Sequence, residues 1–131
     1  MRRLIRGLFA FEALITLGTG VMGMLNPTAF AAQFVVEPPT GAGLDFVRWL
    51  MATYFVIATL ELGLLWRGTR EAWVLALVPI LLGDALHVLG HATMLSHGGL
   101  VGMPTWASFG FTAVFATARI LVLRKPELVV S

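Results

Sequence analysis

The sequence contains no cysteine among its 131 residues. Disulfide bonds, zinc–thiolate sites, iron–sulfur clusters and thiol catalysis are therefore excluded. Charge is also scarce, because Asp, Glu, Lys and Arg make up only 12% of the chain, against about 25% in an ordinary soluble domain. The formal net charge is only +2, and the basic residues are confined to a few sites. We therefore expect no nucleic acid as a partner.

What remains is strongly apolar, with 58% hydrophobic residues and a mean hydropathy of +0.88. The hydrophobic residues form four segments, at residues 4–25, 44–66, 72–95 and 106–123. Each is long enough, as a helix, to cross the roughly 30 Å hydrocarbon core of a bilayer. The sequence predicts a single all-α domain over residues 1–131, an integral membrane four-helix bundle whose first segment is a retained span.

Basic residues are missing from two of the three connections, at residues 26–43 and 96–105. They gather at the opposite ends of the segments, at Arg2, Arg3, Arg6, Arg67, Arg70, Arg124 and Lys125. Because positively charged loops stay inside, this distribution predicts cytoplasmic termini in a bacterial-type inner or plasma membrane. Residues 28–36 are expected to form a short interfacial helix. Aromatic belts are expected to include Trp49, Trp66, Trp73 and Trp106.

Ionisable residues interrupt the third segment in the stretch GDALHVLGH, residues 83–91. At about 100° per residue, Asp84, His87 and His91 fall within an arc of about 60° on one helix face. Ionisable side chains are costly inside a membrane, so they usually face the interior of a bundle and serve a function. We therefore predict that this face is functional and points into the bundle.

The other segments also carry polar stripes. From the helical rise of about 1.5 Å per residue, we expect two groups of polar residues at different depths. The outer cluster is predicted to contain Asp45, Arg48, Asp84, His87 and His91, and the inner cluster Glu12, Arg119 and Glu61. The carboxylates outnumber the arginines, so charge balance requires protonated carboxyls, a charged histidine or a recruited cation.

A surplus of buried carboxyl groups next to histidine favours proton transfer. The leading prediction is a membrane-embedded enzyme that needs no cofactor and applies acid–base chemistry to a small lipophilic substrate. Isomerisation, cyclisation or epoxide opening would be the reaction type. The predicted catalytic residues are Asp84, His87, Glu12 and His91. The predicted substrate contacts are Arg48, Glu61, Tyr54, Phe55, Thr112, Phe115 and Arg119.

The sequence leaves other interpretations open. His87 and His91 are potential ligands for a metal ion or haem, which would make the protein a redox or metal-binding membrane subunit. The buried charges are alternatively structural ion pairs in a non-catalytic membrane partner protein. The second segment has a further polar face, with Tyr54 and Glu61, which leaves room for a homodimer.

The first half of the chain resembles the DoxX-like group of small four-helix membrane proteins. The resemblance covers roughly residues 6–66 and rests on Arg6-Gly7, on LNPTAF at residues 25–30 and on DFVRWLMATYFVIATLELGLLW at residues 45–66. It implies a four-helix membrane fold and a link to redox or quinone processes. The GDALHVLGH stretch lies outside the part of the chain that resembles this group.

Overall fold

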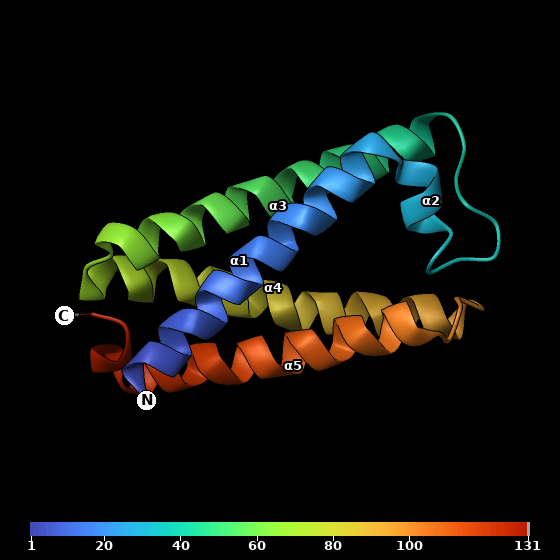
Figure 1. The fold of residues 1–131 in the computed structure, drawn as a ribbon. Helices are drawn as coiled ribbons and strands as arrows, with labels where there is room; N and C mark the ends of the chain where they lie inside the picture. The colour runs from blue at the N-terminus through green and yellow to red at the C-terminus, as the bar shows by residue number, and fades with distance from the viewer. Residues whose placement is uncertain (131) are drawn as a thin grey trace.

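The computed structural model describes residues 1–130 and is dominated by four long helices. Each is long and apolar enough to cross a membrane, judged by length and composition. They are α1 (Arg2–Leu25), α3 (Ala42–Arg67), α4 (Arg70–Ser96) and α5 (Met103–Arg124), as Figure 1 shows. The four predicted helical segments are therefore confirmed, and each helix extends slightly beyond its predicted bounds.

Two short helices complete the described chain, α2 (Pro27–Ala31) and the 3₁₀ helix η1 (Pro126–Leu128). The Asn26 side chain ends one helix and begins the next, because its oxygen accepts a hydrogen bond from the Ala29 N–H at 3.1 Å. Pro27 follows at the first helical position, where its missing N–H costs nothing. The predicted interfacial helix over 28–36 is therefore shorter than expected. Beyond it, the Phe34 carbonyl accepts from the Leu100 N–H at 2.8 Å.

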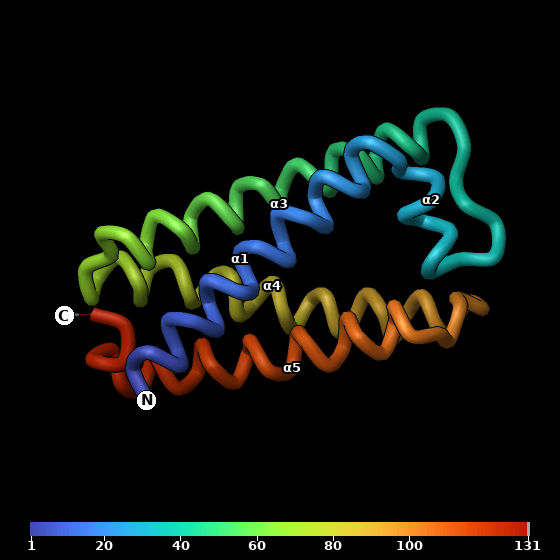
Figure 2. The backbone as a smooth tube through the Cα atoms, in the orientation of Figure 1, coloured from blue at the N-terminus to red at the C-terminus, as the bar shows by residue number. Residues whose placement is uncertain are grey.

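The helices form two pairs, α1 with α3 and α4 with α5 (Figure 2). All four converge at the end of the bundle that holds residue 1 and η1, here called the closed end. Toward the far end, which holds α2 and the α4–α5 connection, the two pairs diverge. Glycines at positions 20 and 23 of α1 allow close approach to α3, where both face Met51.

Large side chains fill the closed end. Phe9 and Trp73 are both 0% exposed, and their ring centroids lie 5.2 Å apart. Trp73 is therefore part of the core, and the prediction that it belongs to an aromatic belt was wrong. Arg6 ties the chain together here, since its guanidinium donates to the Val129 carbonyl at 2.5 Å and to the Leu65 carbonyl.

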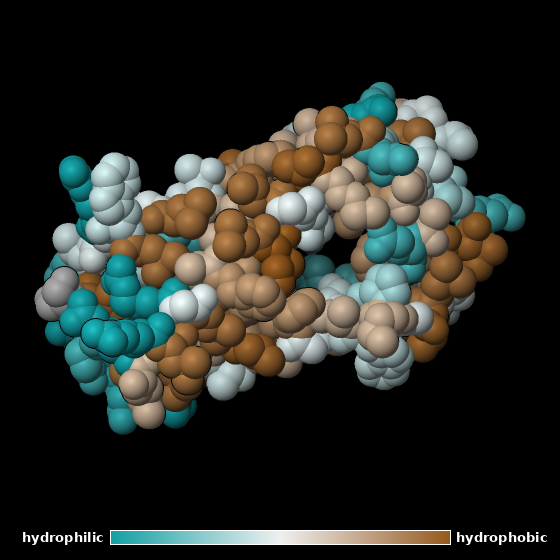
Figure 3. Space-filling model, in the orientation of Figure 1, coloured by the Kyte–Doolittle hydropathy of each residue, from teal (hydrophilic) through white to brown (hydrophobic). Residues whose placement is uncertain are grey.

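The diverging half is hollow. Figure 3 shows an opening between the α1–α3 pair and the α4–α5 pair, with residues coloured hydrophilic along part of its rim. Phe34 bridges the two pairs at the far end, because its ring meets His91 edge-on with centroids 5.8 Å apart. We call the space between Arg119 and Phe34 the chamber.

Candidate functional site

One residue from each long helix meets at the base of the chamber. The Arg119 guanidinium of α5 donates through Nη2 to Oε1 of Glu12 and, at 3.2 Å, to Oε1 of Glu61. Its Nη1 donates to Oδ2 of Asp84 at 2.7 Å. These residues belong to α1, α3 and α4. We call Glu12, Glu61, Asp84 and Arg119 the arginine cluster.

The cluster is buried except on one side. Arg119 is 1% exposed, Glu61 0% and Glu12 5%. The Asp84 side chain is 17% exposed. Asp84 is therefore the carboxyl through which the buried cluster is most accessible.

Helix direction explains why Asp84 joins this cluster rather than the predicted outer one. Side chains on a helix lean toward its N-terminus. Asp84 lies on α4, which runs away from the closed end, so its side chain leans toward that end. Arg119 lies on α5, which runs in the opposite direction, and its long side chain leans toward the far end. The two therefore meet, although their backbone positions indicated different depths.

The cluster has more acid than base. Three carboxylates would carry −3 and the guanidinium +1, so a fully ionised cluster would hold two uncompensated negative charges. Among residues 1–130, the buried atoms Glu12 Oε2, Glu61 Oε2 and Arg119 Nε have no hydrogen-bond partner. An unbalanced charge in a low-dielectric interior is costly. Protons held on the carboxyls, or a cation, would restore the balance.

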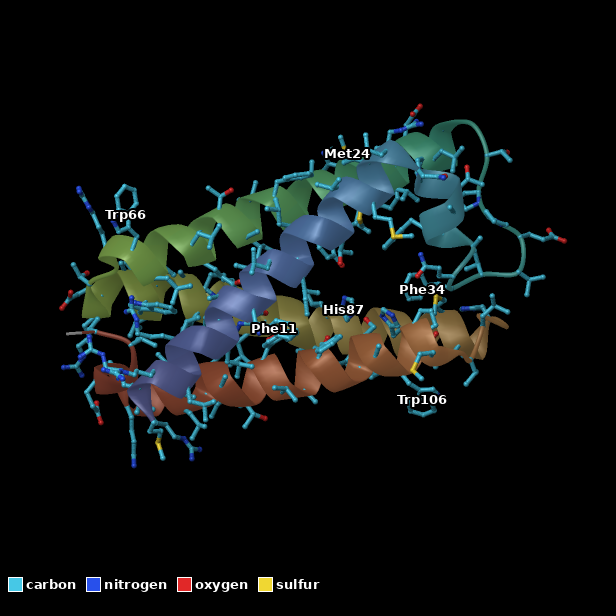
Figure 4. The ribbon with its side chains drawn as sticks, viewed as in Figure 1. Phe11, Met24, Phe34, Trp66, His87 and Trp106 are labelled. Carbon is cyan, nitrogen blue, oxygen red and sulfur yellow. The ribbon has the colours of Figure 1, made fainter. Side chains whose placement is uncertain are left out.

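His87 lies one helical turn beyond Asp84 and faces the space between the helix pairs (Figure 4). Its Nε2 lies 2.8 Å from the Ser108 hydroxyl of α5. Ser108 was not among the predicted site residues. The missed signal was its alignment with Thr112 and Arg119, which places it opposite His87.

His91 completes this polar wall. Its Nδ1 lies 3.3 Å from the His87 carbonyl, and the two imidazole centroids are 4.4 Å apart. Phe34 and Phe109 pack against the His91 ring, with Phe109 at a centroid distance of 5.2 Å. The buried His91 Nε2 has no partner within the part of the chain that the structure describes. The histidines are thus ordered by helix α5 and by aromatic contacts.

The predicted outer cluster does not form. Arg48 pairs with Asp45 at 2.8 Å on its own helix, and these side chains are 45% and 76% exposed. The partners are three residues apart near the start of α3, so Arg48 is neutralised locally. Its placement on the surface separates it from the buried arginine cluster.

The remaining predicted contacts lie at different places. Tyr54 and Phe55 pack where α3 meets Gly20 of α1, since a Cβ at Gly20 would be 3.3 Å from Tyr54 Cβ and 3.2 Å from Phe55 Cε2. Phe115 is buried and stacks on Phe111, with centroids 6.0 Å apart. The Thr112 hydroxyl donates to the Ser108 carbonyl at 2.8 Å, so it supports the helix segment that carries Ser108.

Within residues 1–130, no group of three or more His, Asp or Glu side chains has a geometry suited to a metal ion. The Arg119 guanidinium occupies the centre of the three carboxyls. His87 and His91 lie side by side on one helix, with Nε2 of His87 turned to Ser108.

Comparison with known proteins provides no relative from which a function can be transferred. No protein-family model matches the chain, and neither a curated protein nor a solved structure matches it. The resemblance to the DoxX-like group therefore stays a prediction.

Proposed function

We propose that this chain is an integral membrane enzyme that moves protons on a small lipophilic molecule bound in the chamber. Four helices of spanning length support the membrane assignment. Trp66 and Trp106 are 80% and 64% exposed and point away from the bundle near opposite ends (Figure 4), as interfacial anchors would. The basic residues near the closed end favour placing that end in the cytoplasm.

The observation that carries the proposal is the sharing of one guanidinium by three carboxyls, with Asp84 at the accessible edge. The carboxyls of such a cluster are coupled, so a proton is gained or lost by the cluster as a whole rather than by one residue alone. Asp84 delivers or accepts the proton at the chamber. Glu12 and Glu61 act behind it as a reserve, and Arg119 holds all three in place.

His87 is the second proton-transferring group. The Ser108 hydroxyl at Nε2 fixes the orientation of the ring, so Nδ1 is left to exchange a proton with a bound molecule. Shifting a double bond next to a carbonyl requires a proton to be removed from one carbon and a proton to be delivered to another. Asp84 and His87 together supply both steps, and no electrons are exchanged.

The aromatic side chains suit a lipophilic substrate. Phe111 is 40% exposed, stacks on Phe115 and meets Phe11 of α1 edge-on, with centroids 6.3 Å apart. These rings extend from the bundle surface into the protein close to the arginine cluster. These rings would offer an apolar molecule from the bilayer aromatic surface to bind against.

Deuterium transfer to a panel of lipophilic probes tests this function. The purified protein in detergent is incubated in D₂O with a β,γ-unsaturated steroid ketone, a terpenoid epoxide and a short-chain quinone, followed by mass spectrometry. We expect deuterium incorporation or a product with at least one probe. Asp84→Asn and His87→Gln should each slow it by about 10²–10⁴-fold, the usual contribution of a general acid or base.

His97→Gln is the matched control, because His97 is exposed at the end of the same helix. It should leave the rate unchanged. If the folded wild-type protein labels and converts none of the probes, or if Asp84→Asn and His87→Gln retain full activity, the proposal is wrong.

One observation favours the redox or metal-binding alternative, namely the buried and unpartnered His91 Nε2. Metal analysis and a visible spectrum of protein purified without added metal test it. Stoichiometric metal or a haem band that disappears in His91→Ala would replace the acid–base proposal with a ligand role for the histidines. A colourless, metal-free protein that converts a probe would exclude that role for the reaction.

A further inference from the structure

A second candidate site lies at the closed end, away from the chamber. It is a pocket of about 520 Å³ whose lining includes Arg2, Arg3 and Arg6 from α1 and Arg67 from the last turn of α3. The described lining contains no Asp or Glu. Within residues 1–130, none of these arginines has a carboxylate partner within 4.0 Å. Four guanidinium groups thus converge on one pocket without an acidic partner among the described residues.

The arginines have different roles. Arg6 is engaged with the carbonyls of Leu65 and Val129, so it holds the pocket together. Arg67 lies over the Trp66 ring at 4.9 Å, a cation–π contact that orients its guanidinium. Arg2 and Arg3 are exposed at the start of α1. Among residues 1–130, Arg2, Arg3 and Arg67 thus have no carboxylate partner, and their guanidinium groups are placed to bind an anion.

An apolar groove adjoins this pocket. It has a volume of about 650 Å³, is open along α3 and is lined in part by Phe55, Val56, Leu60 and Gly63. Both cavities share Leu64, Arg67 and Gly68, so the groove ends where the basic pocket begins. A Cβ at Gly63 would meet nothing within 4 Å, which leaves the middle of the groove open.

We propose that the two cavities bind one anionic glycerophospholipid, with its phosphate among the arginines and an acyl chain along the α3 groove. Guanidinium groups bind phosphate through paired, charge-assisted hydrogen bonds. Basic pockets at the edge of a membrane protein are suited to anionic lipid headgroups. An inorganic phosphate matches only the basic pocket, whereas the adjoining groove matches a hydrocarbon chain.

Native mass spectrometry of the full chain tests this lipid site directly. Dioleoyl phosphatidylglycerol should bind at one molecule per chain and at least tenfold more tightly than dioleoyl phosphatidylcholine. Arg67→Gln and Arg2→Gln should each weaken phosphatidylglycerol binding by roughly fivefold, as expected for one basic residue near an anionic headgroup. Arg124→Gln is the control, since Arg124 ends α5 near the same end but does not line the pocket.

The groove has its own test. Gly63→Phe fills open space, so we expect a folded protein that binds dioleoyl phosphatidylglycerol at least fivefold more weakly. Its affinity for glycerol 3-phosphate, which has no acyl chain, should not change. Gly18→Phe is the matched control, because position 18 of α1 is equally open and lies outside both cavities.

Several results would overturn this inference. Equal affinity for phosphatidylglycerol and phosphatidylcholine would mean that the arginines do not recognise the lipid headgroup. Inorganic phosphate that displaces the lipid at equal concentration, with no effect of Gly63→Phe, would reduce the feature to an anion site. A dimer that forms only without lipid and is abolished by Gly63→Phe would assign the groove to a second copy of the chain. Circular dichroism and gel filtration establish that each variant is folded.

Discussion

The closed end and the chamber are built from the same four helices, yet different forces hold them together. At the closed end, rings and aliphatic side chains such as Phe9, Trp73 and Val122 are packed without exposure. In the chamber half, contacts between the pairs include the arginine cluster, the Phe11–Phe111 ring pair and Phe34. In the membrane setting proposed above, helices associate through packing and polar contacts rather than through the hydrophobic effect. Polar contacts at the base of the hollow half would then hold the two pairs together.

The comparison teaches where this protein can accommodate a ligand. At the closed end Phe9 and Trp73 fill the core between the pairs, whereas the chamber half exposes part of Asp84, His87 and Ser108. The arginine cluster lies at the boundary between them. It both joins all four helices and brings one carboxyl to the edge of the hollow.

The largest expected effect comes from removing the Arg119 guanidinium from the arginine cluster. Arg119→Gln leaves three buried carboxyls without their shared cation, and the free energy of unfolding should fall by about 3–5 kcal/mol. Arg119→Lys should cost less, because it keeps the charge but loses the paired geometry. Unfolding in mixed detergent micelles with increasing dodecyl sulfate, followed by circular dichroism, measures both. Unchanged stability of Arg119→Gln would show that packing alone holds the pairs together.

Next in size is the loss of packing at the closed end. Phe9 is 0% exposed against Trp73, so Phe9→Ala should leave a cavity and cost about 3 kcal/mol. Phe34→Ala in the partly exposed bridge should cost about 1 kcal/mol or less. The same unfolding experiment compares them. Equal losses would mean that the far end is as tightly packed as the closed end.

A smaller effect is expected within the α1–α3 pair. A Cβ at Gly23 would overlap Cγ and Sδ of Met51, a residue only 1% exposed. Gly23→Leu should therefore cost about 1–3 kcal/mol through overpacking. Gly18→Leu, at a position with no neighbour within 4 Å, is the control. If both variants unfold alike, the close approach at Gly23 does not contribute to stability.

The smallest effect belongs to the exposed ion pair of Arg48 and Asp45. Its side chains are 45% and 76% exposed, so Arg48→Gln should change the unfolding free energy by only about 0–1 kcal/mol. Deuterium transfer by this variant should match the wild-type rate if Arg48 takes no part in the reaction. A large loss of activity with intact stability would restore Arg48 to the predicted substrate-binding group.

Much of the fold was predictable because hydrophobic length is a local property. Runs of apolar residues indicated the long helices to within a few residues. The grouping of charges was less predictable. Depth along a helix axis separated Asp84 from Arg119, whereas the lean of their side chains brings them together.

Other contacts in the structure could not be predicted from the sequence around the residues that make them. Arg6 marked membrane orientation in the sequence, but the structure also uses it to join α1 to Leu65 and Val129. Nothing in the sequence distinguishes Ser108 from other polar residues of the fourth segment, and only the packing of α5 against α4 places its hydroxyl 2.8 Å from His87 Nε2. Trp73 lies near a segment end, like an interfacial residue, but Phe9 and the other helices cover it completely.

The sequence by itself determined the all-helical class, the number of long helices and the ionisable residues that interrupt them. These follow from composition and from periodicity along a single segment. Only the tertiary structure decided that α1 pairs with α3 and that Arg48 stays on the surface. It also decided that Arg119 pairs with a carboxyl from each of the other three long helices. Such choices depend on which helices touch and on how their side chains lean. Neither the helix contacts nor the side-chain directions can be predicted from the spacing of residues along one helix.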